Sequence, residues 1–147
     1  WLREAVGEYI EEEMGHQEWV LNDITAVGGN AEDVRHGHPS IATELMVSYA
    51  WDTIQRINPV GFFGMVLVLE GTSVQLATQA AEAIQKSTGL PDKAFSYLTS
   101  HGSLDVDHIS FFEKLMNKLE DPKDQEAVVH CARMMYKLYG DIFRGIQ

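Results

Sequence analysis

The sequence has few of the residues on which several large classes of protein depend. Cys131 is the only cysteine among 147 residues, which excludes an intrachain disulfide and a cysteine-based zinc site. Lys and Arg number 11 against 22 Asp and Glu, so the formal net charge is −11. This balance argues against nucleic acid or an anionic membrane as a partner, because both need clustered basic side chains. No apolar run approaches membrane-spanning length and no signal peptide is visible, so we expect a cytoplasmic protein that is not bound to a membrane.

The length of the chain fits one domain with a real core. The sequence begins at Trp1, not at Met, and Trp1 enters directly into a helical pattern. We therefore expect residues 1–147 to form a single helical di-metal-binding domain. We also expect it to be a fragment of a slightly longer domain, with one or more N-terminal helices missing.

Alternating strand patterns of useful length are absent, and helical periodicity covers nearly the whole chain. Pro39, Pro91 and Pro122 suit the first turns of helices, whereas Asn58-Pro59 breaks one. The fold predicted is an all-α bundle of about six helices, joined by a long loop over about 22–38. The helices are expected at about 1–21, 39–57, 60–88, 91–98, 100–119 and 122–143.

Three predicted helices carry carboxylates and imidazoles at helical spacing. His101, Asp105 and His108 stand at i, i+4 and i+7, and so share one helical face. Glu13 and His16 stand at i and i+3 on the first segment. Glu70 follows five apolar residues, and a carboxylate buried there needs a partner or a metal ion.

Together these six residues are typical of a two-metal site. Di-iron bundles use a carboxylate-x-x-His pair on each of two helices, and Glu13-x-x-His16 and Asp105-x-x-His108 are such pairs. Glu70 would bridge two ions and His101 would add a nitrogen ligand. Mixed imidazole and carboxylate ligands suit Fe or Mn and do not exclude Zn. The plainer interpretation is that Glu13 belongs to a solvated acidic face and that the histidines form a surface network.

The same motifs resemble a known superfamily over about residues 4–119. The stretches Glu13-Met14-Gly15-His16-Gln17-Glu18-Trp19, Leu69-Glu70-Gly71 and His101-x-x-x-Asp105-x-x-His108 are similar to those of the haem-oxygenase-like di-iron oxidases and oxygenases, which lie near the TenA and PqqC proteins. This superfamily is also called the iron-containing redox enzyme family. The resemblance implies a haem-oxygenase-like all-α bundle and activation of O2 as co-substrate. It also implies oxidation of a small organic substrate, such as a carboxylic or amino acid.

The resemblance also implies the ligand assignment. Glu13, His16 and His101 would hold one iron, and Asp105 and His108 the other, with Glu70 bridging or shared. Some family members place the first glutamate seven residues before the histidine, but here that residue is Tyr9, which cannot replace a carboxylate. Glu13 is therefore the predicted ligand and Glu12 the alternative. Two Fe ions are expected as cofactor, with a Mn/Fe pair as the variant, and a homodimer is the expectation for the assembly.

Several residues could contact the substrate. Candidates for the pocket are Tyr9, Met46, Phe62, Phe63 and Met65, although aromatic and Met stripes more often fill a core. Arg35 and Arg56 could pair with a substrate carboxylate, or lie on the surface.

Two other functions remain open at this point. A metal-free relative of the TenA or PqqC type would use the same fold, and the thiaminase type needs a nucleophilic cysteine, for which Cys131 is the only candidate. A non-catalytic helical metal-binding protein is the other alternative. Metal content separates the metal-free relative from a di-iron enzyme. O2 consumption with a released product separates a di-iron enzyme from the non-catalytic metal-binding protein.

Overall fold

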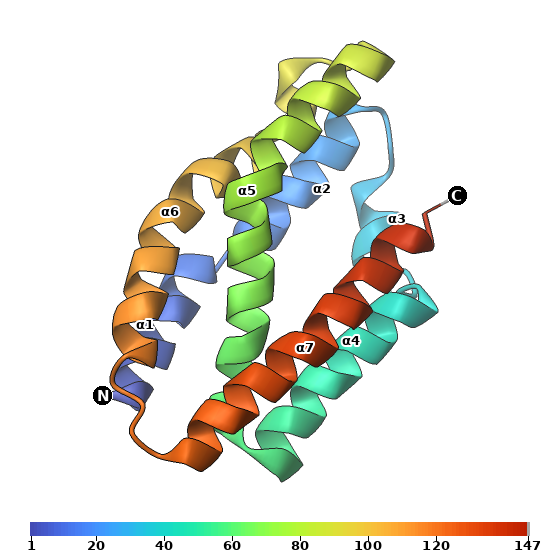
Figure 1. The fold of residues 1–147 in the computed structure, drawn as a ribbon. Coiled ribbons are helices and arrows are strands. Elements are labelled where there is room, and N and C mark those ends of the chain that lie inside the picture. The colour runs from blue at the N-terminus through green and yellow to red at the C-terminus, as the bar shows by residue number, and fades with distance from the viewer. Residues whose placement is uncertain (147) are drawn as a thin grey trace. The chain divides into compact units, whose positions relative to one another are not determined.

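The computed structural model describes residues 1–146, except for the side chains of residues 103–107 inside a helix. The described part contains seven α-helices and no strand, which confirms the all-α prediction. They are α1 (Leu2–Glu13), α2 (His16–Ala26), α3 (Ala31–Arg35), α4 (Ile41–Asp52), α5 (Phe63–Thr88), α6 (Ser96–Met116) and α7 (Pro122–Arg144) (Figure 1). Shorter turns are η1 (Thr53–Ile57), η2 (Pro59–Phe62) and η3 (Asp92–Ala94).

The chain divides into two compact units, and the long helices α5 and α6 each contribute to both. The first unit comprises Trp1–Gly37 and Ser73–His108, and the second comprises His38–Thr72 and Ile109–Gln147. In the first unit, α1 and α2 lie beside the first half of α6 (Figure 1). In the second unit, α4 and α7 lie side by side (Figure 1).

The apolar core of the second unit lies where α4, α5 and α7 meet. Its buried members are Ala50, Val68, Cys131, Ala132 and Met135, with Met46, Tyr49, Met65, Leu67 and Tyr139 packed against them. Gly64 permits this packing, because a Cβ at that position would collide with the Val128 carbonyl and would stand 2.6 Å from the Ala132 amide nitrogen. The first unit buries Ala5, Tyr9, Leu21, Ala77, Ala81 and Phe95, together with His101 and His108.

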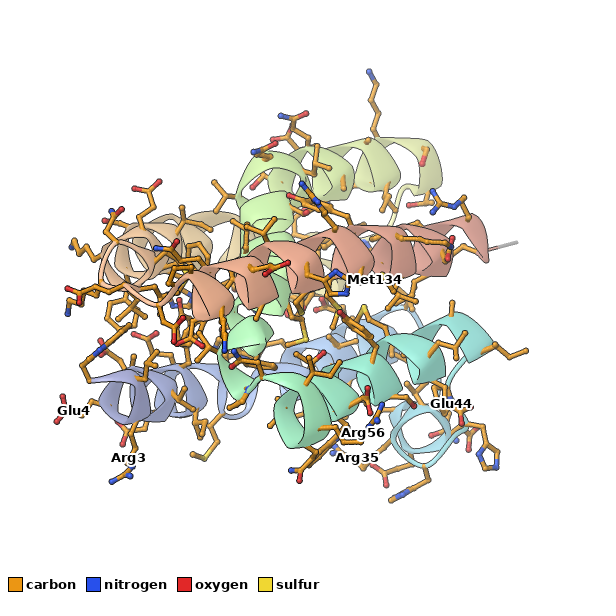
Figure 2. All side chains as sticks on the ribbon, turned by 60° about the horizontal axis from the view of Figure 1, so that its bottom comes forward. Arg3, Glu4, Arg35, Glu44, Arg56 and Met134 are labelled. Atoms are coloured by element: carbon orange, nitrogen blue, oxygen red, sulfur yellow. The ribbon has the colours of Figure 1, made fainter. Side chains whose placement is uncertain are left out.

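Polar side chains fix the helix starts much as the sequence indicates. Ser40 caps α4 by accepting a hydrogen bond from the Thr43 amide, so Pro39 precedes the cap and is not in the first turn. Asp121 caps α7, with Pro122 in its first turn as predicted. Acidic and basic residues cover the outer faces, and Arg3 and Glu4 at the start of α1 point away from the ribbon (Figure 2).

Three helix boundaries differ from the prediction. The helix expected over about 1–21 ends at Glu13 and starts again at His16, and the expected loop contains the end of α2 and all of α3. The helix expected to end near Ile57 changes at Thr53 to a wider π-helical turn, closed by the Asn58 amide donating to the Thr53 carbonyl at 3.0 Å. The break expected near residue 99 is absent, because α6 runs without interruption from Ser96 to Met116.

The structure also corrects the expectation about apolar runs. Pro59–Thr88 is a continuous 30-residue helical segment whose best 18-residue window has a mean hydropathy of 1.5, which is long and apolar enough to cross a membrane. The core helix of a globular bundle passes the same test. Val68, in this segment, is fully buried in the core of the second unit, and 39% of the apolar window is buried.

Candidate metal centre

The first part of the candidate centre is built at the joint between α1 and α2. Glu13 is the last residue of α1 and His16 is the first residue of α2. The chain turns between them at Met14 and Gly15, and Gly15 has a φ of 97°, in the left-handed region that favours glycine. The i, i+3 spacing predicted that the two residues share one helical face, but they lie on two different helices. The turn nevertheless brings them together, and His16 Nδ1 donates to Glu13 Oε2 at 2.9 Å.

Helix α6 supplies two histidines, His101 and His108, to the same place. His101 is only 7% exposed, and its Nε2 lies 4.0 Å from Glu13 Oε2. Its other nitrogen, Nδ1, lies 3.0 Å from the carbonyl oxygen of Tyr97. A carbonyl only accepts, so Nδ1 carries the hydrogen, and in the neutral ring Nε2 keeps the lone pair. The Nε2 lone pair and the Glu13 carboxylate therefore face each other as two acceptors. A cation between them would stabilise this arrangement.

Glu13 is the common partner of His16, His101 and His108, all in the first unit. Its Oε2 faces His16 and His101, while its Oε1 lies 3.8 Å from Nδ1 of His108. Glu12, the alternative ligand, contacts only His108 among these rings, through Oε2 at 3.4 Å from Nε2. The Glu13 carboxylate thus presents one oxygen to two imidazoles and its other oxygen to a third.

Aromatic rings enclose the histidines. The ring of Trp19 stacks on that of His16 at a centroid distance of 4.2 Å, and its edge meets His101 at 5.6 Å. The Tyr97 ring lies 4.2 Å from that of His101. Tyr9, a predicted pocket residue, is buried and meets His108 edge-on at 6.5 Å. These rings restrict how the imidazoles can turn and limit the access of water.

Sequence reasoning gave no role at the site to Trp19 or Tyr97. The available signal was their spacing, since Trp19 stands three residues after His16 and Tyr97 four residues before His101. On a helix, both spacings place the aromatic ring one turn from the imidazole.

The donor set in the first unit fits a divalent metal ion. One ligand atom from each of Glu13, His16 and His101 lies within 4.8 Å of the others. Two atoms bound at ~2.1 Å to one ion are ~3.0 Å apart at a right angle and at most ~4.2 Å apart. The Glu13–His16 and Glu13–His101 separations of 2.9 and 4.0 Å fall within that limit. An ion bound by Glu13 and His16 would replace the proton that they share.

Two predicted ligands remain to be placed. Glu70 is buried on α5 in the second unit, three positions before the boundary with the first, and burial of a carboxylate is costly. The side chain of Asp105 lies outside the part of the chain that the structure describes. For both residues the ligand role stays a prediction.

The other predicted substrate residues lie in the second unit. Phe63 is buried, Phe62 is half-buried, and Met46 and Met65 pack against the apolar core cluster. Their role in a substrate pocket also stays a prediction.

Both candidate arginines already have carboxylate partners. Arg35 donates to both oxygens of Glu18 at 2.7 Å and also to Glu32. Hydrogen bonds from Arg35 hold the pKa of the Glu18 carboxyl below its usual range. In the second unit, Arg56 forms a bidentate ion pair with Asp52.

Cys131 has the surroundings of a structural residue. Its side chain is 1% exposed in the core of the second unit. Burial raises the pKa of its thiol, which opposes the thiolate that a nucleophile needs. This disfavours the thiaminase-type alternative.

Comparison with known proteins shows the family of this chain. A family model described as iron-containing redox enzyme matches residues 1–140. Neither the curated proteins nor the solved structures contain a match to this chain.

Proposed function

This chain belongs to the iron-containing redox enzyme family, and on that premise we propose that it is a non-haem di-iron oxidoreductase that uses O2 to oxidise a small organic substrate. Membership of the family itself supports an oxidoreductase. The number of ions, the use of O2 and the substrate are the proposal. A Mn/Fe pair would suit the same mixed ligands.

One observation carries the proposal. The Glu13 carboxylate faces His16 and His101 with one oxygen and His108 with the other. This carboxylate thus lies among three imidazoles, two of which are nearly fully buried. We assign Glu13, His16 and His101 to one ion, and Asp105 and His108 to a second. Glu70 is proposed to be shared between the ions.

The protein's own part in the reaction is to hold ligands and exclude water. When bound, the iron ions would supply the redox chemistry with O2. The Tyr97 carbonyl holds the proton of His101 on Nδ1 and so presents Nε2 to the centre. Trp19 and Tyr97 cover His16 and His101, which keeps the local dielectric low.

The substrate is proposed to be a small carboxylic or amino acid. Of the predicted pocket residues, Tyr9 lies beside a proposed ligand, His108. We propose that Tyr9 lines the substrate pocket and that Phe62, Phe63, Met46 and Met65 shape it. A homodimer is proposed as the assembly, and mass measurement by light scattering tests it.

The deciding experiment is anaerobic titration of Fe(II) into the whole chain, followed by addition of O2 under optical monitoring. We expect two Fe(II) per chain, and an absorbance change with O2 that is lost in Glu13→Ala, His101→Ala and Glu70→Ala. His130→Ala is the matched control, because His130 is exposed on α7 in the second unit. This control should bind and react like the wild type.

Two outcomes would redirect the assignment. Failure of the wild type to bind iron stoichiometrically would refute the metal centre and leave the metal-free relatives as the leading function. Binding of iron without consumption of O2 in a screen of carboxylic and amino acids would favour a non-catalytic metal-binding protein.

A further inference from the structure

We propose that Asp23 is a positioning residue for the metal centre, acting through the start of α6 to orient His101. The proposal concerns a carboxylate outside the ligand set. It rests on the proposed function only for the identity of what His101 binds.

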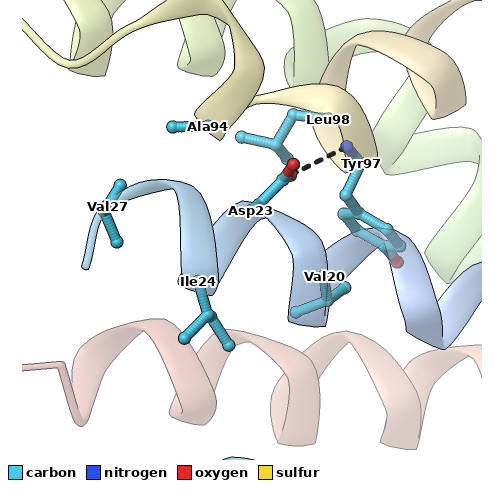
Figure 3. Close-up of a pocket in the computed structure, with 7 residues that line it drawn as sticks. All are labelled: Val20, Asp23, Ile24, Val27, Ala94, Tyr97 and Leu98. Carbon is cyan, nitrogen blue, oxygen red and sulfur yellow. Dashed lines mark hydrogen bonds between the residues drawn. The ribbon is translucent and has the colours of Figure 1, made fainter. Parts of the chain in front are cut away.

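Asp23 forms three hydrogen bonds with the first turn of α6. Its Oδ1 accepts from the amide and from the hydroxyl of Ser96, at 3.0 and 2.5 Å. Its Oδ2 accepts from the amide of Tyr97 at 2.9 Å, the bond drawn in Figure 3. The first amides of a helix have no partner within the helix, and a carboxylate also suits the positive end of the helix dipole. Asp23 therefore caps α6 from a different helix, more than 70 positions away in the chain.

Tyr97 connects this cap to the metal centre through its backbone. Its amide donates to Asp23, and its carbonyl accepts from Nδ1 of His101. The backbone of Tyr97 is thus bound to Asp23 through its amide and to the His101 imidazole through its carbonyl. A shift of the first turn of α6 would move the carbonyl that keeps the His101 proton on Nδ1.

Asp23 also sets the register between the two helices that bear His16 and His101. His16 and Asp23 are seven residues apart on α2, which is close to two turns, so they lie on one face. Asp23 meets Tyr97 near the start of α6, and His16 meets His101 four residues further along, with ring centroids 4.9 Å apart. The two helices are therefore antiparallel, fastened by Asp23 at one end of this contact and joined by imidazoles at the other.

The surroundings of Asp23 strengthen its bonds to α6. It lines a groove together with the apolar residues Val20, Ile24, Val27, Ala94 and Leu98 (Figure 3). Few other polar groups compete there for the carboxylate. Charge-assisted bonds to backbone amides are stronger than neutral ones.

The first test needs no metal. Histidine tautomers can be read in 15N-labelled, metal-free protein by two-bond 15N–1H correlation, with His101→Gln identifying the signal of His101. We expect His101 of the wild type to carry its proton on Nδ1, and Asp23→Ala to populate the Nε2-protonated form. Asp23→Asn keeps one acceptor oxygen and should give an intermediate result, which serves if the alanine variant does not fold. An unchanged tautomer in both variants would overturn the proposal.

The second test measures binding of Mn(II), followed by calorimetry. We expect Asp23→Ala to weaken binding about tenfold, the usual scale for loss of a group that orients a ligand. Asp121→Ala is the matched control, because Asp121 caps α7 in the second unit through the amide of Lys123 at 2.9 Å. Equal weakening in both variants would show only a general loss of stability and would overturn the positioning role. If the wild type bound no metal, the proposed function would fail, and the tautomer would still decide the role of Asp23.

Discussion

Gly15 is the residue on which the geometry of the Glu13–His16 pair depends. It lies in the turn that ends α1 and starts α2, with a φ of 97° and open space around a Cβ position. The constraint is therefore backbone conformation and not crowding. Without this turn the two side chains would return to the spacing of a continuous helix.

We expect Gly15→Ala to destabilise the protein by about 1–2 kcal/mol, because an L-residue with a side chain is strained in the left-handed region. It should also weaken binding of Mn(II), since relief of the strain moves His16 relative to Glu13. Gly15→Asn should cost less, because asparagine tolerates this conformation better. Urea unfolding and calorimetric titration measure the two effects. Equal stability of Gly15→Ala and the wild type would show that the turn does not require glycine.

At the scale of elements, the packing of α5 on α7 depends on a second glycine. Gly64 brings the two backbones so close that a Cβ would stand 2.6 Å from the Ala132 amide nitrogen and 2.9 Å from Cβ of Cys131. A Cβ added at Gly7, inside α1, would have nothing within 4 Å of it. Both glycines lie within helices, but only Gly64 lies against another helix too closely to admit a Cβ.

We expect opposite effects of alanine at these two positions. Gly64→Ala should destabilise the protein by about 1–3 kcal/mol, because the helices must separate to admit the methyl group. Gly7→Ala should stabilise it by about 0.5–1 kcal/mol, because alanine loses less backbone entropy in a helix. Urea unfolding followed by circular dichroism compares them. A neutral Gly64→Ala would mean that α5 and α7 pack less closely than described.

The last turns of α7 hold an ion-pair group whose contribution depends on pH. Lys137 donates to Asp141 at 2.6 Å and Arg144 donates to it at 2.8 Å. Hydrogen bonds from Lys137 and then Arg144 lower the pKa of the Asp141 carboxyl below its ordinary value of 3.8. A folded-state pKa below the unfolded one means that the carboxylate contributes stability above the unfolded pKa. That contribution is lost as the pH falls through the lowered pKa.

Asp141→Asn should therefore be less stable than the wild type at pH 7 by a small margin. The margin should be constant down to about pH 5 and close as the pH falls below the ordinary pKa of 3.8. Thermal unfolding of both proteins between pH 7 and pH 3 measures it. High salt should shrink the margin at pH 7, because the groups are at the surface. A margin that grew on acidification would contradict the assigned pairing.

At the scale of the whole molecule, a bound metal ion should stabilise the fold as well as equip it for chemistry. Its proposed ligands come from α1, α2 and α6 in the first unit, and an ion held by all three opposes their separation. An ion that binds only the folded state at 100 times its Kd adds about 2.7 kcal/mol. For a chain of this length, that corresponds to a rise in Tm of about 5–10 °C.

We therefore expect Mn(II) or anaerobic Fe(II) to raise Tm by that amount, and a chelator to reverse it. His101→Gln should abolish the rise, and His130→Gln should keep it, because His130 is exposed on α7. Differential scanning calorimetry measures the shift. An equal rise in both variants would place the ion elsewhere on this acidic chain.

The sequence by itself determined the helical class and several helix boundaries. Caps and breaks are local, so Asn58-Pro59 and Asp121-Pro122 act within a few residues of themselves. The spacing of His101 and His108 on one helix could also be predicted, because α6 is regular between them. The membership of the family was predicted from the motifs, and the match over residues 1–140 confirms it.

Only the tertiary structure decided how these pieces meet. A glycine inside a helical pattern costs about 1 kcal/mol and is often tolerated, so the sequence could not show that the chain turns at Gly15 while Gly64 stays helical. The capping of α6 by Asp23 joins residues more than 70 positions apart, which no local pattern encodes. Contacts between distant segments depend on how whole helices pack. For that reason the carboxylates and imidazoles could be read from the sequence, whereas the turn, the cap and the carbonyl that orient them could not.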